Sequence, residues 1–276
     1  MFEALKMQNI FKTASLFIVL LIANISVSYS QDFNKGLEAF NRGDYAEALQ
    51  QFEQLAFKGH AEAEFYLGDM YYYGRGVTKD YVTSANWFRL AAEQGHAYAQ
   101  NNLGYAYFSG KGVTQNYKTA VKWYRLAAEQ GNANAQTSLG VLYYNGEGVT
   151  QDYKTAVKWY RLAAEQGNAF AQSNLGYAYE RGRGVTQDYK TAVKWYRLAA
   201  EQGNANAQNN LGALLYNGQG VLKDKPRALM WYILSKSNGY DTSENIEIAS
   251  KNMTSRDISK AQKMAQECKQ KNFKGC

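Results

Sequence analysis

Histidine, one of the side chains best suited to acid–base catalysis, occurs twice in this chain, at His60 and His96. The two lie 36 residues apart, at a position where later copies of the same segment carry Asn132, Asn168 and Asn204. Asparagine at such a place caps a helix by accepting a hydrogen bond from an early backbone N–H group. We therefore expect the two histidines to be capping or turn residues rather than catalytic ones.

Other residues that support catalysis are few. Four glutamates recur with the same spacing and are expected to be structural or solvated: Glu93, Glu129, Glu165 and Glu201. No unrepeated set of nucleophile, histidine and acid stands out, and the recurring G-x-G tripeptide lacks the preceding strand that a nucleotide-binding loop needs. The sequence predicts a protein that is not an enzyme and that holds no cofactor and no metal.

The two cysteines, Cys268 and Cys276, lie close together at the C-terminal end. Two thiols are too few ligands for a structural metal site, and neither histidine is near them in the sequence. In an exported protein an isolated close pair favours a disulfide over free thiols. By the chain-entropy relation, closing so short a loop contributes at most about 2.5 kcal/mol.

Residue types suited to binding a peptide or a glycan vary between copies of the segment, at four positions spaced three, four and three residues apart. On a helix this spacing forms one stripe. Amide side chains donate and accept hydrogen bonds together, and aromatic rings offer a large contact area with few rotatable bonds. The residues expected to line a partner-binding groove are Phe65, Asp69, Tyr72, Tyr98, Asn101, Tyr105, Phe108, Asn134, Tyr144, Phe170, Tyr177 and Asn209.

A ladder of nine cations is the second candidate surface: Lys118, Lys122, Arg125, Lys154, Lys158, Arg161, Lys190, Lys194 and Arg197. Such a ladder suits an anionic surface, for example acidic glycan or lipid head groups. The alternative is a solvated face on which Arg125 pairs with Glu129 one helical turn away. Nucleic acid is not expected as a partner, because the aromatic residues do not interleave with the ladder.

These positions recur because the sequence contains five tandem copies of one 36-residue unit. A unit of this length cannot bury its own apolar face, so a strict period indicates stacked repeats. The second half of the unit hardly varies, and residues 148–168 and 184–204 are identical over 21 residues. A Leu-Gly pair marks each copy, at Leu67-Gly68, Leu103-Gly104, Leu139-Gly140, Leu175-Gly176 and Leu211-Gly212.

Each copy is predicted to be an antiparallel helix pair. In the third copy the helices are expected at about 133–145 and about 153–166, with Asn132 and Asp152 as N-caps. Glycines follow each helix, where the backbone can adopt a positive φ. Small alanine and glycine side chains let the two backbones approach closely, and aromatic side chains fill the remaining volume.

The pattern A-x-A-x-x-x-L-G-x-x-Y-x-x-G-x-G-V-x-x-D-Y-x-x-A-x-x-W-Y-x-x-A-A resembles the Sel1-like repeat (SLR), a cousin of the tetratricopeptide repeat. The resemblance implies an all-α fold, a right-handed α-solenoid of antiparallel helix pairs, whose variable stripes face a concave groove. Residues 31–60 resemble a single tetratricopeptide helix pair, and residues 241–276 are predicted to form a C-terminal helical cap. The five repeats are expected at residues 61–96, 97–132, 133–168, 169–204 and 205–240.

The first thirty residues read as a secretory signal peptide. Two lysines precede an apolar run at residues 15–27, and small residues precede Gln31, before which cleavage is expected. The run is shorter than the roughly 20 residues that span a bilayer, although an uncleaved anchor is the alternative. We expect a periplasmic or secreted protein with no stable membrane insertion after cleavage. Its net charge of +7 permits acidic partners without requiring them.

The leading hypothesis is a non-catalytic scaffold or adaptor of the bacterial envelope that binds a peptide or protein segment, from an envelope or host protein, in the groove. One alternative is an envelope-surface binder of peptidoglycan or acidic glycan. Another is a β-lactamase-like enzyme, as described for cysteine-rich relatives of this repeat. Those relatives carry a cysteine pair in every repeat, which this chain lacks. The oligomeric state is left open.

Overall fold

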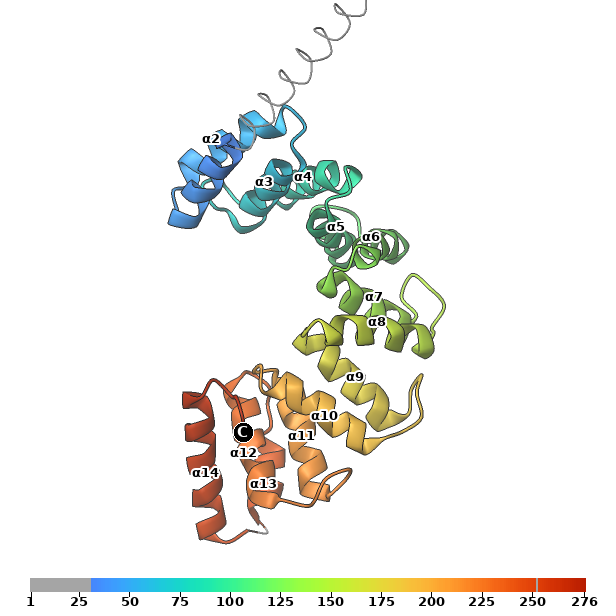
Figure 1. The fold of residues 1–276 in the computed structure, drawn as a ribbon, viewed down its shortest axis with the longest axis vertical. Coiled ribbons are helices and arrows are strands. Elements are labelled where there is room, and N and C mark those ends of the chain that lie inside the picture. Colours follow the sequence, from blue (N-terminus) through green and yellow to red (C-terminus); the bar gives the residue numbers. More distant parts are fainter. Residues whose placement is uncertain (1–30, 252) are drawn as a thin grey trace, which may run out of the picture. The chain divides into compact units, whose positions relative to one another are not determined.

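The computed structural model describes residues 31–251 and 253–276, and all regular secondary structure in these residues is helical (Figure 1). The predicted all-α repeat solenoid is thereby confirmed. Two compact units make up the chain, with a boundary between Gln115 and Asn116. The expected signal peptide at residues 1–30 lies outside the described residues.

The first unit contains a helical segment at residues 31–42 and four further helices. These are α2 (Tyr45–Ala56), α3 (Ala61–Tyr73), α4 (Tyr81–Glu93) and α5 (Ala97–Ser109). Within this unit α2 packs against α3, α3 against α4, and α4 against α5. At the N-terminal end the core is aromatic, because Phe52 is fully buried and its ring stacks on Tyr66 with 5.0 Å between centroids.

The second unit continues the same arrangement from residue 116 onward. Its helices are α6 (Tyr117–Glu129), α7 (Ala133–Asn145), α8 (Tyr153–Glu165), α9 (Ala169–Arg181), α10 (Tyr189–Ala200), α11 (Ala205–Asn217), α12 (Lys225–Ser237), α13 (Ser243–Lys251) and α14 (Ser255–Gln270). From α6 to α13 each helix packs against its successor or shares the core with it, and α14 lies alongside α12 (Figure 1). We call α3, α5, α7, α9 and α11 the first helices of the repeats, and α4, α6, α8, α10 and α12 the second helices.

The first helices begin at the capping residues that the sequence predicts. Asn132 Oδ1 accepts from the N–H of Ala135 at 2.9 Å, and His96 Nδ1 accepts from the N–H of Ala99 at 3.1 Å. His60 caps α3 in the same way, so the capping role expected for both histidines is confirmed. Asp152 caps α8 as predicted. That helix ends at residue 165, one position earlier than expected.

The Leu-Gly pair that marks each repeat has a packing reason. Leu139 is fully buried, and a Cβ added to the neighbouring Gly140 would lie 2.6 Å from the ring of Tyr160. Tyr160 comes from the second helix of the same repeat and is itself buried. The missing side chain on the first helix therefore leaves the space in which the tyrosine ring lies.

A second glycine brings neighbouring repeats into contact through their backbones. Gly184 follows α9 and has a φ of +74°, a conformation that other residues rarely adopt. A Cβ at this position would overlap with the carbonyl group of Tyr153, the first residue of α8 in the preceding repeat. Gly148 stands in the same relation to Tyr117 at the start of α6. The G-x-G loop is therefore an inter-repeat joint.

Buried glutamines link the repeats from inside. Gln136 Nε2 donates to the carbonyl of Ala128 at 3.1 Å, and Gln136 Oε1 accepts from Gln166 Nε2 at 2.8 Å. The corresponding Gln172 forms the same two bonds in the next repeat. The first repeat carries Glu64 at this position, where burial raises the pKa of the carboxyl group against a smaller lowering by the hydrogen bond from Gln94.

The C-terminal part packs onto the last repeat. Thr254 caps α14 by accepting from the N–H of Asp257 at 3.2 Å. Cys268 and Cys276 form the disulfide that the sequence favours, with 5.7 Å between their Cα atoms. Phe273, inside the loop that this disulfide closes, contributes to the same hydrophobic core as α10, α11 and α12. None of the helices in the described residues is both long and apolar enough to cross a bilayer.

Candidate functional site

The predicted groove residues lie on the first helices, on α3 and α5 in the first unit and on α7, α9 and α11 in the second. We call this set the variable stripe. Its most exposed rings are Tyr98 and Phe170, with exposed fractions of 62% and 67%. Asn134 is also exposed, and Tyr105 is 39% exposed. The other members are half-buried: Phe65, Asp69, Tyr72, Asn101, Phe108, Tyr144, Tyr177 and Asn209.

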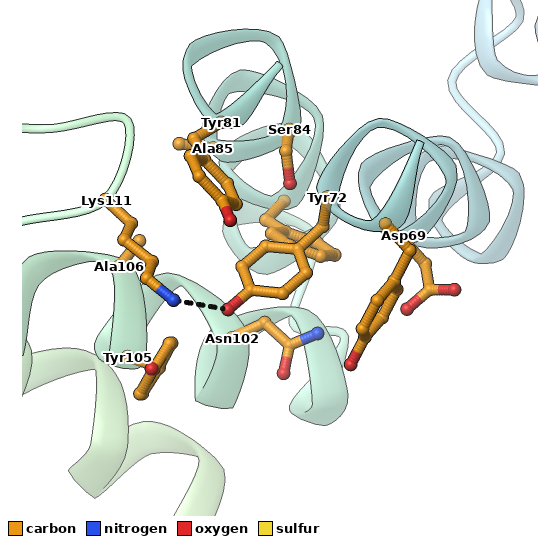
Figure 2. A pocket seen from close by; sticks show the side chains of 11 residues that line it. Asp69, Tyr72, Tyr81, Ser84, Ala85, Asn102, Tyr105, Ala106 and Lys111 are labelled. Atoms are coloured by element: carbon orange, nitrogen blue, oxygen red, sulfur yellow. Dashed lines mark hydrogen bonds between the residues drawn. The ribbon is translucent and has the colours of Figure 1, made fainter. Parts of the chain in front are cut away.

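In the first unit the stripe borders a cavity of about 240 Å³ between α3, α4 and α5 (Figure 2). Three tyrosine rings surround the ammonium group of Lys111, whose Nζ lies 5.5, 5.4 and 5.5 Å from the ring centroids of Tyr72, Tyr81 and Tyr105. Lys111 Nζ also donates a hydrogen bond to the hydroxyl of Tyr72 at 3.3 Å. That hydrogen bond is the main reason why the pKa of Lys111 is raised. We call these four residues the first cation–tyrosine cluster.

Asp69 lines the same cavity, on the far side of the Tyr72 ring from Lys111 (Figure 2). Its carboxylate accepts a hydrogen bond from Arg75 at 3.0 Å within an ion pair. Burial raises the pKa of Asp69, and the positive charge of Arg75 opposes this shift. Since Arg75 compensates Asp69 locally, the negative charge at this end of the cavity is already neutralised.

Phe65 takes part in a separate aromatic contact of the first unit. Its ring stacks on His96 with 4.8 Å between centroids and lies 6.2 Å from Tyr98. Burial lowers the pKa of His96, which keeps its imidazole neutral and able to accept the capping hydrogen bond. Asn101 lies on the same face and donates to the side chain of Asn102 at 3.2 Å.

The second unit repeats the cluster with arginine in place of lysine. The guanidinium of Arg183 donates to the hydroxyl of Tyr144 at 2.5 Å and lies 5.6 and 5.5 Å from the ring centroids of Tyr144 and Tyr153. The ring of Tyr177 lies 6.3 Å from that of Tyr144. Arg181, one turn along α9, lies over Tyr177 at 5.4 Å. Tyr144, Tyr153, Tyr177 and Arg183 form the second cation–tyrosine cluster.

Corresponding members of the two clusters are separated by 72 residues, which is two repeats. The exposed rings Tyr98 and Phe170 are also 72 residues apart. The scaffold therefore recurs with every repeat, whereas the cation–tyrosine clusters and the exposed rings recur after two repeats.

Three further predicted groove residues, which also lie outside both clusters, form hydrogen bonds elsewhere. The backbone carbonyl of Phe108 accepts from the side chain of Gln115 at 2.8 Å. Asn134 accepts from Asn168 at 2.9 Å, which joins two repeats at the start of their first helices. Asn209 accepts from Asn245 of α13 at 2.7 Å, so it is engaged by the C-terminal part of the chain.

Both clusters contain residues that the sequence analysis missed. Lys111 and Arg183 belong to the loop after the first helix, and Tyr81 and Tyr153 are the first residues of second helices. The sequence did contain a signal for the cations, because one position between two constant glycines varies among the five loops. It reads Arg75, Lys111, Glu147, Arg183 and Gln219. The tyrosines gave no signal, because they belong to the nearly invariant half of the repeat.

The basic ladder of the second helices is partly occupied by contacts within the scaffold. Arg125 donates to the hydroxyl of Tyr143 at 2.6 Å, and Arg161 donates to that of Tyr179 at 2.7 Å. Each bond joins one repeat to the next. The expected pair of Arg125 with Glu129 is not among the ion pairs formed by residues 31–251 and 253–276. The arginines therefore act as inter-repeat links, because the tyrosine offers an acceptor at closer range.

Comparison with known proteins agrees with this repeat architecture. The Sel1 repeat matches five consecutive segments, at residues 61–96, 97–132, 133–168, 169–204 and 205–240. The chain belongs to the Sel1 repeat family. Sel1 repeat proteins mediate protein–protein interactions, and the fold is typically a non-catalytic scaffold. A comparison with curated protein sequences gives no match.

Two solved structures show the likeness in three dimensions. A Sel1 repeat protein from Oxalobacter formigenes is 37% identical, with a TM-score of 0.70, over 78% of this chain and 88% of that one. A protective antigen present in uropathogenic Escherichia coli strains, which displays an SLR fold, is 33% identical with a TM-score of 0.75. That match covers 89% of this chain but only 54% of the antigen, so this Sel1 repeat protein spans about half of it.

Proposed function

We propose that this Sel1 repeat protein is an exported, non-catalytic adaptor that binds a polypeptide segment of a protein partner on the variable stripe of its first helices. The exposed aromatic residues Tyr98 and Phe170 carry this proposal. Large exposed rings are unfavourable on a surface that contacts only water, and they are typical of interaction sites. Both lie on first helices, beside clusters of polar and aromatic groups.

Substitutions that the scaffold already tolerates support the same proposal. Repeats three and five carry Asn134 and Asn206 where repeats two and four carry Tyr98 and Phe170. Asparagine at this position is compatible with an unchanged helix pair, so an aromatic ring is not needed for folding. The rings are therefore available for a partner.

Location outside the cytoplasm is part of the proposal. The basic and apolar pattern of residues 1–30 is typical of a signal peptide, and the disulfide between Cys268 and Cys276 suits an oxidising compartment. A bacterial envelope provides both conditions. The proposed partner is accordingly an envelope protein or a protein that the envelope contacts.

The test is partner capture by residues 31–276 from the envelope of the source bacterium, with cross-linking and mass spectrometry. The variant Tyr98→Asn/Phe170→Asn replaces both exposed rings with the residue of the neighbouring repeats. We expect it to lose the captured partner while keeping its helical circular dichroism and its unfolding midpoint.

The matched control changes two exposed apolar residues of second helices, Leu126→Asn and Leu198→Asn, which are 45% and 46% exposed. It should retain capture. Capture that survives in the Tyr98→Asn/Phe170→Asn variant, or that is lost only in the control, would contradict binding on the variable stripe.

A further inference from the structure

Each cation–tyrosine cluster contains one positive charge that is not part of an ion pair in the described part of the chain. Among residues 31–251 and 253–276, no carboxylate lies within ion-pair distance of Lys111 or Arg183. Their neighbours Arg75 and Arg181 do have such partners, in Asp69 and Glu180. The chain thus pairs the adjacent cations with acids and leaves the cluster cations on neutral tyrosine hydroxyls.

Each cluster cation has more hydrogen-bond donors than its bond to a tyrosine hydroxyl uses. Lys111 has three ammonium protons and Arg183 has five guanidinium protons, and each donates to one tyrosine hydroxyl. The tyrosine rings hold the cation by its attraction to their faces. A positive group fixed in this way, beside hydroxyls that also donate, is arranged to receive an anionic oxygen.

We propose that each cation–tyrosine cluster binds a carboxylate side chain of the partner polypeptide, so that one chain accepts two acidic residues. This inference rests on the proposed function and adds the chemistry of the bound segment. In the first unit the cavity of about 240 Å³ lies at the cluster, with rings that contact the methylene groups of a glutamate. The overall positive charge of the chain favours the same class of partner.

The spacing of the exposed rings specifies the segment further. Tyr98 and Tyr105 lie two turns apart on α5, and Phe170 and Tyr177 lie two turns apart on α9. Seven helical residues span about 10.5 Å. An extended peptide covers that distance in roughly three residues. The recognised segment therefore carries an acidic residue and an apolar residue about three positions apart.

The test uses isothermal titration calorimetry with blocked peptides that carry Glu and Phe three residues apart, in both orders, and with matched peptides in which Gln replaces Glu. Wild-type residues 31–276 should bind two molecules of a Glu peptide and should bind the Gln peptide about 10- to 100-fold more weakly, as expected for loss of a charge-assisted hydrogen bond. Binding that does not distinguish Glu from Gln overturns the inference, and so does absence of binding to the wild type.

Single variants assign the two sites. Lys111→Met and Arg183→Met should each leave one site, and the double variant should leave none, while Lys111→Arg should keep both because arginine serves in the second cluster. Lys122→Met, on an exposed second-helix position, makes the same charge change and should retain two sites. Carboxylate recognition is overturned if the double variant still binds two peptides. It is also overturned if inorganic phosphate binds the two sites as tightly as the Glu peptide does.

The same variants separate this inference from the proposed function. If envelope capture is lost in Tyr98→Asn/Phe170→Asn but persists in Lys111→Met/Arg183→Met, the adaptor function stands and the carboxylate sites are wrong. If both double variants lose capture and the peptide experiments behave as described, both proposals are supported.

Discussion

Both helices of each repeat contribute buried residues to the core, but they differ in how much their other positions vary between repeats. In α6, α8 and α10 the polar and basic residues repeat without change, and their arginines join neighbouring repeats, as Arg161 joins Tyr179. The changing residues of the first helices include exposed rings such as Tyr98. They also include Tyr72, whose ring lies beside Lys111 from the next repeat. The constant arginines thus serve contacts within the scaffold, and the variable positions include the surface on which we propose that a partner binds.

The largest effect should come from removing a scaffold ring. Tyr160→Ala takes away a buried side chain that fills the space beside Gly140, and truncation of buried aromatic residues lowers the free energy of unfolding by about 3–5 kcal/mol. Phe170→Ala, on an exposed position, should change it by less than about 0.5 kcal/mol. Urea unfolding followed by circular dichroism measures both. Similar losses for the two variants would erase the distinction between the helices.

The inter-repeat joint should be nearly as sensitive. Gly184→Ala imposes a positive φ on alanine and places its Cβ against the backbone of Tyr153, which should lower the free energy of unfolding by about 2–4 kcal/mol. Gly167→Ala is the matched control, because its φ is +91° but no atom lies within 4 Å of the added Cβ. The control should lose only about 1–2 kcal/mol. Equal losses would show that contact with the preceding repeat contributes nothing.

Glu64→Gln should make the first repeat more like the others. Burial raises the pKa of Glu64 in the folded chain, so the folded state binds its proton more tightly than the unfolded state does, and stability is lost as pH rises above about 4.5 toward the folded pKa. Glutamine carries no such charge and can donate to a carbonyl as Gln136 does. We expect the variant to be more stable at pH 7 and the difference to shrink toward pH 4.

A thermal-unfolding series from pH 4 to pH 7 on both proteins tests this expectation. A difference in unfolding midpoint that is independent of pH would mean that the pKa of the Glu64 carboxyl group is the same in the folded and unfolded states.

His96→Asn should produce the smallest change, and its pH-dependent part is confined to acidic solution. Burial lowers the pKa of His96 below its usual 6.5, so the unfolded state takes up a proton first and stability falls as pH drops through 6.5 toward the folded pKa. Asparagine caps the equivalent helix at Asn132 without titrating. Relative to the wild type, the unfolding midpoint of the variant should rise between pH 8 and pH 5.5, on top of a pH-independent loss from removing the ring that stacks on Phe65. A parallel pH profile for the two proteins would contradict this linkage.

The sequence was sufficient for the scaffold because its determinants are local and repeated. Asn132, Asp152 and Gly146 fix where helices begin and end through bonds within a few residues, and five copies of the pattern leave little ambiguity. The disulfide followed from the presence of a single close cysteine pair. These features need no knowledge of which side chains meet across repeats.

The candidate site was only partly predictable because its contacts are long-range. Periodicity places Tyr72 on the stripe of its own helix, but it does not indicate that Lys111, 39 residues further along, would lie over its ring. Tyr81 was not predicted for a different reason. Its position is a tyrosine in four of the five repeats, so comparing the repeats does not single it out. Comparing repeats two apart, rather than neighbouring ones, would have shown that Tyr105 recurs as Tyr177 and that the cation Lys111 recurs as Arg183.

The identity of residues 148–168 and 184–204 has a consequence for inheritance. An unequal exchange between coding segments for these two stretches would delete 36 residues and leave a continuous sequence pattern of capped helix pairs. Tyr144 would then be followed directly by the last repeat, because the segment that holds Tyr177 and Arg183 would be gone. Such a deletion would keep the pattern of helix pairs and would remove the second cation–tyrosine cluster, one of the two carboxylate sites that we propose.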